Sequence, residues 1–469
     1  MRLHRPLVLR RIQPFIAAVL VSCLAASPLR AGVGDQFESP PVHPLDLTPD
    51  GNRLCAVQTY DQRVTVFDLT QGPLPVIENE IPVGLEPVTV RARTNTELWV
   101  VNHVSDSISI VDLTTGNVVR TLQPGDEPTD VVFAGGQAFV VVSQEDRVQV
   151  YDAVNPSLDL GSIPLDASDP RSIAVSTDGS ALYVTAMDSG NRTTVVPASV
   201  VAASLGAPPP DPPRDPALPP APDVGLIVRH DGTHWVDELG RSWDFAVGYT
   251  LLDQDLIEID VASRTVTRTF SGLGTTLFNV AVNPVSGALY VTNQQATNDV
   301  RFEPNLKGAF IRNQVSVVQP GPGTVTPVHL NPHINYADAA GSAGERALSL
   351  AIPLDVLAAP DGQTVYVAAF GSDRVGVLDA AGAVLRRIPV GVDSRFQRPD
   401  RCVPGKRPSH ARRNCRDVIP RAGHPSRPTT SRPASAATPA GPGRASGLSV
   451  AGLSISLCLI QAGNPAPRD

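Results

Sequence analysis

Arg171-Ser-Ile-Ala-Val-Ser-Thr-Asp-Gly-Ser-Ala-Leu-Tyr-Val-Thr-Ala186 is the stretch that decides the fold. Its two runs of alternating apolar and polar residues, rich in β-branched side chains, flank the pair Asp178-Gly179. This pattern predicts two antiparallel strands joined by a tight turn. The same pattern recurs three times, at residues 45–57 around Asp50-Gly51, at 279–293 around Ser286-Gly287 and at 355–368 around Asp361-Gly362.

Each pair of runs is followed by a third and a fourth strand-like run. The third run closes on an acid in most units, and Asp68, Asp112 and Asp152 stand 44 and 40 residues apart. Four strands per unit of about 40 residues predict an all-β fold, a β-propeller of four-stranded blades, with six blades recognisable of an expected seven within residues 43–391. Because the closing acids recur at one point of the repeat, they are predicted to start turns. They are Asp68, Asp112, Asp152, Asp260 and Asp379.

Two insertions interrupt the repeat, at residues 187–250 in the fourth blade and near residue 300 in the fifth. The first contains a proline-rich linker, residues 208–216, and a run around Asp231-Gly232 that predicts a hairpin with a two-residue turn. In that hairpin His230 would pair with Thr233. Trp235 and Trp243 are expected to pack the insertion onto the propeller.

The charge distribution separates the body of the chain from its end. The 469 residues carry a formal net charge of −8, yet residues 401–469 contain ten Arg and one Lys against two Asp, a net of +9. The remainder is therefore near −17, since −8 minus +9 is −17. Such an acidic body argues against a nucleic-acid partner, because affinity for nucleic acid depends on basic side chains that contact phosphates.

The first 31 residues have the pattern of an export signal. Four arginines precede an apolar run, residues 15–26, that is too short to span a membrane. Export to the periplasm or the cell surface is therefore expected, with no transmembrane span. Leu20-Val-Ser-Cys23 also resembles a bacterial lipoprotein cleavage box, which leaves a lipid anchor at Cys23 as an alternative to a soluble mature protein.

The repeat stops near Phe396. Residues 396–469 read as a low-complexity basic tail, and from residue 401 onward it holds no Trp, Tyr or Phe. Two explanations are open: a disordered extension, or a frameshift near residue 400, at the point where a seventh blade is due. An open ring would leave the edges of its first and last blades uncovered, which predicts poor solubility.

The motif Tyr290-Val-Thr-Asn293, with looser copies at residues 99–102, 183–186 and 366–369, resembles the signature of the YVTN-type propeller repeats. The resemblance covers residues 43–391 and implies the fold, usually with seven blades. Some proteins of this type continue into a C-terminal di-haem cytochrome c peroxidase-like domain. No Cys-x-x-Cys-His haem-attachment motif occurs here, so no haem cofactor is expected.

Ligand-face candidates come from the loops between second and third strands, which share one face of a propeller with the blade-to-blade connections. Carboxylates and amides there could bind a divalent cation or a polar ligand, although short β-loops favour the same residues for turn formation alone. His103 breaks the repeat and is the strongest single candidate. The candidates are His103, Asp106, Asp61, Asp146, Asp188, Asn293 and Asp373.

Three hypotheses of function follow. The first is an exported binding or interaction module of the cell envelope, which takes a small polar ligand or acts as a scaffold for a protein such as a redox partner. The second is a lactonase-like hydrolase that uses a cation in the propeller funnel. The third is the truncated remnant of a propeller–cytochrome oxidoreductase. No catalytic residue can be assigned from the sequence, and an enzyme is the less favoured interpretation.

Overall fold

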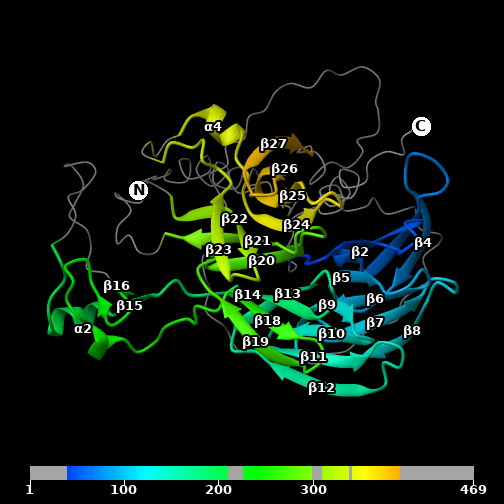
Figure 1. Ribbon diagram of the computed structural model, residues 1–469, viewed down its shortest axis with the longest axis horizontal. Coiled ribbons are helices and arrows are strands. Elements are labelled where there is room, and N and C mark those ends of the chain that lie inside the picture. The colour runs from blue at the N-terminus through cyan, green and yellow to red at the C-terminus, as the bar shows by residue number, and fades with distance from the viewer. Residues whose placement is uncertain (1–39, 210–224, 298–308, 337, 339–340, 391–469) are drawn as a thin grey trace, which may run out of the picture. The chain divides into compact units, whose positions relative to one another are not determined.

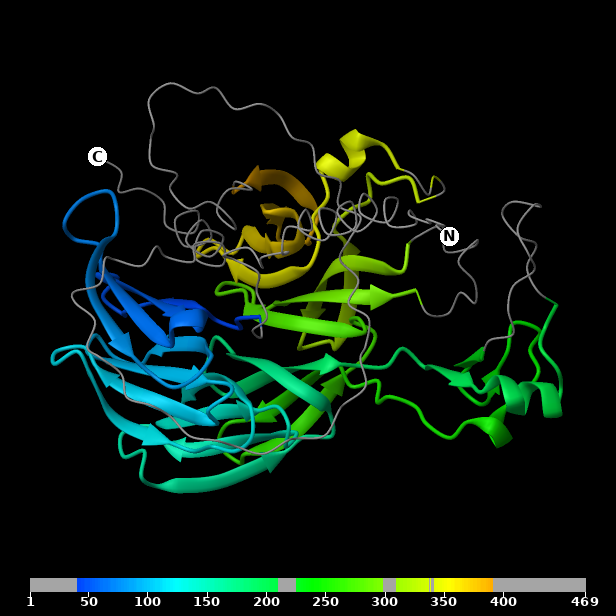
Figure 2. The same cartoon turned by 180° about the vertical axis from the view of Figure 1, so that it is seen from behind.

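Six blades of four antiparallel strands form the body of the described chain, and those of blades 4 and 5 are joined into one eight-stranded sheet where Asp188 pairs with Thr276. The computed structural model describes residues 40–209, 225–297, 309–336, 338 and 341–390. Figure 1, and Figure 2 from behind, show the sheets following one another in chain order, from the blue and cyan strands of the first blades to the gold strands of the last. The fold is a β-propeller, as predicted.

The strands of each blade run in sequence from the innermost to the outermost. Blade 1 consists of β1 (Leu45–Leu47), β2 (Arg53–Gln58), β3 (Arg63–Asp68) and β4 (Val76–Pro82). Blade 2 consists of β5 (Pro87–Ala92), β6 (Glu97–Asn102), β7 (Ser107–Asp112) and β8 (Asn117–Leu122). Blade 3 consists of β9 (Pro128–Ala134), β10 (Gln137–Val142), β11 (Arg147–Asp152) and β12 (Asp159–Pro164).

The remaining three blades follow the same order. Blade 4 consists of β13 (Ser168–Val175), β14 (Ala181–Asp188), β18 (Leu256–Asp260) and β19 (Thr265–Phe270). Blade 5 consists of β20 (Thr276–Val282), β21 (Leu289–Ala296), β22 (Ile311–Gln319) and β23 (Thr324–His329). Blade 6 consists of β24 (Pro353–Ala358), β25 (Thr364–Ala369), β26 (Arg374–Asp379) and β27 (Val384–Pro389).

The turns form as their residue types predict. Gly179 has a φ of +73°, a left-handed conformation that glycine adopts without a steric penalty, and the Asp178 carboxylate accepts the backbone N–H of Ser180. At the ends of the third strands, Asp68 and Asp112 accept the N–H groups two residues further on, at 2.7 and 2.8 Å. The structural role predicted for the closing acids is therefore confirmed.

Apolar clusters between neighbouring blades hold the blades together. In the described residues, five clusters each join one blade to the next, from blade 1 with blade 2 to blade 5 with blade 6. Trp99 illustrates the contact: it is fully buried, and its ring meets Phe133 of the next blade edge-to-face with centroids 5.3 Å apart.

The first and last blades each carry a further apolar cluster on the face that no neighbouring blade shares. On blade 6 this cluster is built around Tyr366 and Val377, and on blade 1 around Leu54 and Phe67. No cluster of the described residues joins blade 6 to blade 1. The described chain is therefore a row of six blades with five interfaces.

The insertion in blade 4 forms a small unit with its own core. It contains β15 (Thr193–Val196), α2 (Ala198–Ala203), β16 (Leu226–His230) and β17 (Trp235–Val236), and the three strands form one sheet. Trp243 is fully buried in a cluster made by the insertion itself, so the expectation that it packs on the propeller is wrong. Most of the proline-rich linker, from residue 210 on, lies outside the described residues.

The predicted register of the hairpin in this insertion is also wrong. His230 pairs with Trp235 rather than with Thr233, and the turn is two residues longer on that strand. The Asp231 carboxylate accepts the N–H groups of both Thr233 and His234, at 2.8 and 2.9 Å. These two bonds close a wider loop than an Asp-Gly pair alone implies.

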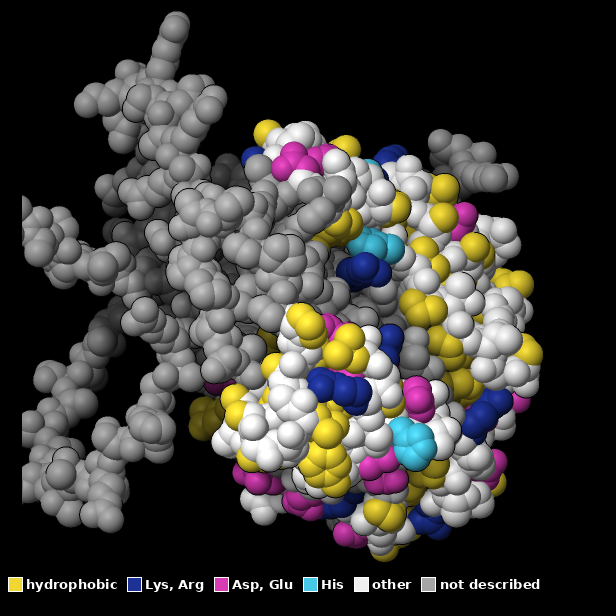
Figure 3. All heavy atoms as spheres, turned by 90° about the vertical axis from the view of Figure 1, so that its left-hand side faces the viewer, with side chains coloured by type: hydrophobic (Ala, Val, Ile, Leu, Met, Phe, Trp, Pro, Cys, Tyr) yellow, Lys and Arg dark blue, Asp and Glu magenta, His cyan; other side chains and the backbone are white. Residues whose placement is uncertain are grey.

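The surface carries charges of both signs. On the face shown in Figure 3, acidic and basic side chains are interspersed among uncharged ones, and the described residues there form no extended basic patch. None of the helices in the described ranges is long and apolar enough to cross a membrane. The predicted export signal, Cys23 and the basic tail lie outside these ranges.

A buried carboxyl group, Asp255, connects the insertion end of blade 4 to blade 5. Its side chain bonds the Ser189 hydroxyl and accepts the N–H groups of Leu273 and Gly274. Burial raises the pKa of Asp255 to about 7 despite these bonds. The protonated carboxyl can donate to Ser189, whose hydroxyl donates in turn to the Leu252 carbonyl.

Replacement Asp255→Asn is expected to remove a pH dependence of stability. In the unfolded chain an Asp side chain titrates near pH 4. Between about pH 4 and 7 the folded protein therefore binds one more proton, on Asp255, than the unfolded chain does. The free energy of unfolding then falls as pH rises, by up to about 1.4 kcal/mol per pH unit. Urea unfolding at several pH values should show this contribution to the slope in the wild type and its loss in Asp255→Asn, on a background from other carboxyl groups that both proteins share. The exposed-turn variant Asp361→Asn should keep it, and equal slopes in all three would contradict the assignment.

Candidate functional site

The predicted ligand-face residues lie near the starts of the innermost strands. Asn293 pairs with Leu277 and Asp188 with Ser168, each at the first residues of an inner strand or next to them. Asp61 lies in the short 3₁₀ turn 59–61 that follows β2. Asp61 thus lies in the predicted loop, whereas Asp188 is the last residue of β14 and Asn293 lies inside β21, so the loop placement predicted for Asn293 is wrong.

Several of these side chains make bonds between or within blades. Asp106 and Asp146 have φ values of +51° and +46°, and their carboxylates accept the N–H groups of Glu127 and Asp169, which begin the next blades. Asp373 occupies the equivalent left-handed position in blade 6, with a φ of +52°. The repeat therefore uses these carboxylates at the junctions between strands and blades.

His103 and Asp188 are brought near Asp169, a residue that the sequence did not single out. The pKa of Asp169 is raised, first by burial and then by Asp188, while His103 acts to lower it. His103 Nδ1 lies 3.2 Å from the Pro128 carbonyl oxygen, and its Nε2 lies 3.7 Å from Glu127. Among the described residues, no group of three His, Cys, Asp or Glu side chains could hold a metal ion.

Asn293 is buried and bonded locally. Its Nδ2 donates to the Val291 carbonyl and to the Ser316 hydroxyl, both at 2.9 Å, and its Oδ1 is buried without a hydrogen bond. This side chain therefore belongs to the interior of blade 5.

A belt of polar side chains surrounds the central channel. Five inner strands have a β-bulge at the same point. In a bulge the inner strand has an extra residue that the neighbouring strand does not match, and this changes the direction of the side chain that follows. That side chain is polar in each of these five blades, and His43, which precedes β1 and forms an isolated bridge with Thr89, adds a sixth polar side chain. The polar belt consists of His43, Thr89, Asp130, Ser172, Asn279 and Asp355.

Hydrogen bonds connect the polar belt from blade to blade. His43 N–H donates to Thr89 Oγ at 3.3 Å, and Thr89 Oγ donates to the Thr129 carbonyl of blade 3 at 2.7 Å. Further along, the Ile173 N–H of blade 4 donates to Asp130 at 3.0 Å.

The belt continues through blades 4 to 6. Ser172 Oγ donates to Asn279 Oδ1 at 2.8 Å, and Asn279 Nδ2 donates to Asp355 Oδ1, also at 2.8 Å. Asn279 Nδ2 also lies 3.1 Å from the Val42 carbonyl of the segment before blade 1. The belt therefore has a bonded link at each of the five described blade junctions.

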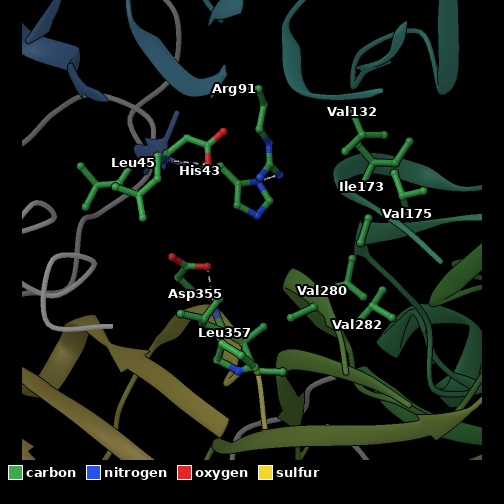
Figure 4. Close-up of a pocket in the computed structure, with 17 residues that line it drawn as sticks. His43, Leu45, Arg91, Val132, Ile173, Val175, Val280, Val282, Asp355 and Leu357 are labelled. Carbon is green, nitrogen blue, oxygen red and sulfur yellow. Dashed lines mark hydrogen bonds between the residues drawn. The ribbon is translucent and has the colours of Figure 1, made fainter. Parts of the chain in front are cut away.

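A cavity of about 500 Å³ opens beyond the polar belt, toward the ends of the inner strands. It lies at the opposite end of these strands from the predicted ligand face. Residues of all six inner strands line it, and most of the lining is apolar (Figure 4). At the next inward-facing position of the inner strands, four blades place Val132, Ala174, Ala281 and Leu357, whereas blade 2 places Arg91 and blade 1 places Asp46.

Arg91 and His43 line one wall of the pocket, and both contact the buried Asp130. Arg91 Nη2 lies 2.6 Å from His43 Nδ1 and 3.3 Å from Asp130 Oδ1, and His43 Nδ1 lies 2.9 Å from Asp130 Oδ2. Nδ1 serves either as acceptor for Arg91 or as donor to Asp130, according to the tautomer. In both tautomers the opposite ring nitrogen, Nε2, has no hydrogen bond to any described residue.

Asp355 lies across the pocket from Arg91, with the His43 ring between them (Figure 4). Its Oδ1 accepts Asn279 Nδ2 and the N–H of Val356, both at 2.8 Å. Within the described ranges its Oδ2 has no hydrogen-bond partner.

The three carboxyl groups around His43 titrate differently. Burial raises the pKa values of Asp46 and Asp355. Burial also acts to raise the pKa of Asp130, but the Arg91 guanidinium and the His43 ring beside it hold that pKa below its usual value. The negative charge of the buried Asp130 carboxylate is therefore balanced by the Arg91 guanidinium. Within the described part of the chain, Asp355 has no equivalent counter-charge.

Two features of the sequence mark this site. A proline lies two residues before each of five belt residues, at or near the start of the inner strand: Pro41, Pro87, Pro128, Pro170 and Pro353. Arg91 breaks the apolar repeat two residues after Thr89, as a functional residue is expected to do, and Asp46 breaks it at the equivalent position of blade 1. The position of Arg91 could be found only by aligning the inner strands of all blades.

Solved structures share the fold. Kuenenia stuttgartiensis hydrazine synthase superposes with a TM-score of 0.54 at 17% identity, covering 77% of this chain and 90% of that chain. The Pseudomonas aeruginosa periplasmic gluconolactonase gives 0.44 at 17% identity, covering 78% and 88%. At 17% identity the similarity to the hydrazine synthase establishes the fold alone. No protein-family model and no curated protein matches the chain.

Replacement Arg91→Leu, which installs the residue type that Leu357 provides at this position in blade 6, is expected to destabilise the protein. Asp130 would remain buried without its guanidinium, at a cost of about 3 kcal/mol at pH 7. Because the lowered pKa of Asp130 gives stability that is lost as pH falls, the difference from wild type should shrink on acidification. Denaturant unfolding at pH 7 and pH 4 measures both values.

Arg53→Leu is the matched control, since Arg53 pairs with Glu78 on the surface. It should cost less than about 1 kcal/mol. An Arg91→Leu variant as stable as this control would show that Arg91 does not compensate Asp130.

Proposed function

We propose that the chain is an exported β-propeller of the YVTN type, a binding module whose ligand is a small polar molecule held in the central pocket. One observation carries the proposal: polar atoms of His43, Arg91 and Asp355 face a largely apolar cavity and have no partner in the described chain. Small-molecule sites typically combine an apolar cavity of a few hundred cubic ångströms with a few convergent polar groups.

Two features support a site in the channel rather than on the predicted face. The side chains of the pocket belong to six different blades, so the fold itself fixes their positions. The carboxylates of the predicted face, by contrast, take part in turns and blade junctions. Export to the periplasm or the cell surface is supported by the sequence of residues 1–31, and lipid attachment at Cys23 and a bound divalent cation stay predictions.

The binding function is tested with a variant that fills the pocket. Leu357→Trp adds a large ring at the pocket wall and should abolish binding of any small molecule that stabilises the wild type in a thermal-shift screen and binds in calorimetry. Leu385→Trp lies on an exposed position of the outermost strand and should bind like wild type. Ligands that bind both variants equally would place the site elsewhere, and the absence of any hit from a broad metabolite screen would count against the proposal.

A second candidate function, hydrolysis of a small ester or lactone, is favoured by the pair His43 and Asp130. With Nδ1 donating to Asp130, the Nε2 lone pair of His43 faces the pocket, where it could accept a proton from an attacking water. This candidate needs no bound cation.

Hydrolysis predicts turnover of chromogenic esters or small lactones that His43→Gln lowers by at least ~100-fold in kcat. The variant should still bind the substrate, because the cavity is unchanged. Wild-type protein without turnover, or a His43→Gln variant with full activity, would remove the hydrolase from consideration and leave the binding module.

A further inference from the structure

The polar atoms that face the pocket differ in charge and lie on opposite walls. Arg91 offers Nη1, a positively charged donor with no partner among the described residues, because Nη2 is the atom that contacts His43 and Asp130. Asp355 offers Oδ2, a carboxyl oxygen that carries negative charge once the group is ionised. Figure 4 shows the two side chains entering the pocket from different sides, with apolar side chains around them.

Arg91 is suited to hold a carboxylate. A guanidinium pairs with a carboxylate through charge-assisted hydrogen bonds, and here the contacts with His43 and Asp130 already fix its orientation. Its Nε is buried without a hydrogen bond, so the remaining Nη1 is the group available to a ligand. A pre-oriented guanidinium loses little side-chain freedom when it binds.

Asp355 is suited to hold an ammonium group. Asn279 and the Val356 N–H both bond Oδ1, which fixes the carboxylate and directs Oδ2 to the pocket. Burial raises the pKa of Asp355, and a cationic donor at Oδ2 would supply the counter-charge that Asp130 already has in Arg91.

Apart from Asp46, whose carboxylate accepts the N–H groups of Leu47 and Ala92, the rest of the lining favours a ligand with an apolar side chain. Leu45, Leu47, Val280, Val282 and Leu357 present no hydrogen-bonding group to the cavity. A sugar would leave most of its hydroxyl groups without partners against such walls, which costs binding free energy. A phosphate would meet the carboxylates around His43.

We propose that the pocket binds a zwitterionic α-amino acid with an apolar side chain. Its carboxylate pairs with Arg91, its ammonium group pairs with Asp355, and its side chain packs against the apolar walls. This inference rests on the proposed binding function and names the class of ligand.

The test compares L-leucine with two analogues that each lack one charge. In titration calorimetry with the full chain, wild-type protein should bind L-leucine about tenfold or more tightly than 4-methylpentanoate, which lacks the ammonium group, and than leucinamide, which lacks the carboxylate. Asp355→Asn retains an oxygen for Asn279 and Val356 but presents an amide to the ligand. It should weaken L-leucine at least about tenfold and leave 4-methylpentanoate unchanged.

The wild-type comparison alone keeps the inference testable if Asp355→Asn proves unstable. Equal affinities for the three ligands, or no binding of L-leucine or of any other apolar amino acid, would overturn the inference. If a screen finds other ligands that Leu357→Trp excludes, the binding function stands and only the ligand class fails. If Leu357→Trp excludes no ligand, the proposed function fails as well.

Discussion

The hydrogen-bonded polar belt around the channel is the constraint on which the rest of the structure depends. Each inner strand must turn its side chains toward a narrow, largely dry centre, where an unpaired polar group is costly. The bulge at the same point of five inner strands places one polar side chain per blade where it can bond the next blade. The belt thereby fixes the spacing of the blades, and the apolar clusters between them pack at that spacing.

The pocket follows from the belt. Beyond it, mostly apolar residues of the inner strands line the cavity. Arg91 and Asp46 are charged at a position that is apolar in the other four blades, and Arg91 can be charged there because Asp130 and His43 of the belt lie beside it. The belt has no bonded link between Asp355 and His43, the members from the last and the first described blades. The free carboxylate oxygen and ring nitrogen of these two residues give the pocket its polar character.

The same asymmetry appears in the hydrophobic core. Each blade between the first and the last shares one apolar cluster with the blade before it and one with the blade after it, whereas blades 1 and 6 each keep one cluster to themselves. The loss of the repeat pattern at residue 396 occurs directly after the last described blade. Both observations fit a repeat array in which stability comes from interfaces between neighbours.

The sequence by itself determined the repeat, the four strands of each blade and their turns. These depend on local alternation and on residues such as Asp178 and Gly179, whose preferences act over a few positions. The closing acids were predictable for the same reason. Only the tertiary structure decided the hairpin register around Asp231, the burial of Trp243 within the insertion, and the site. His43, Arg91 and Asp355 are up to 312 residues apart (355 minus 43), and they meet only because the bulged inner strands of different blades converge on one channel.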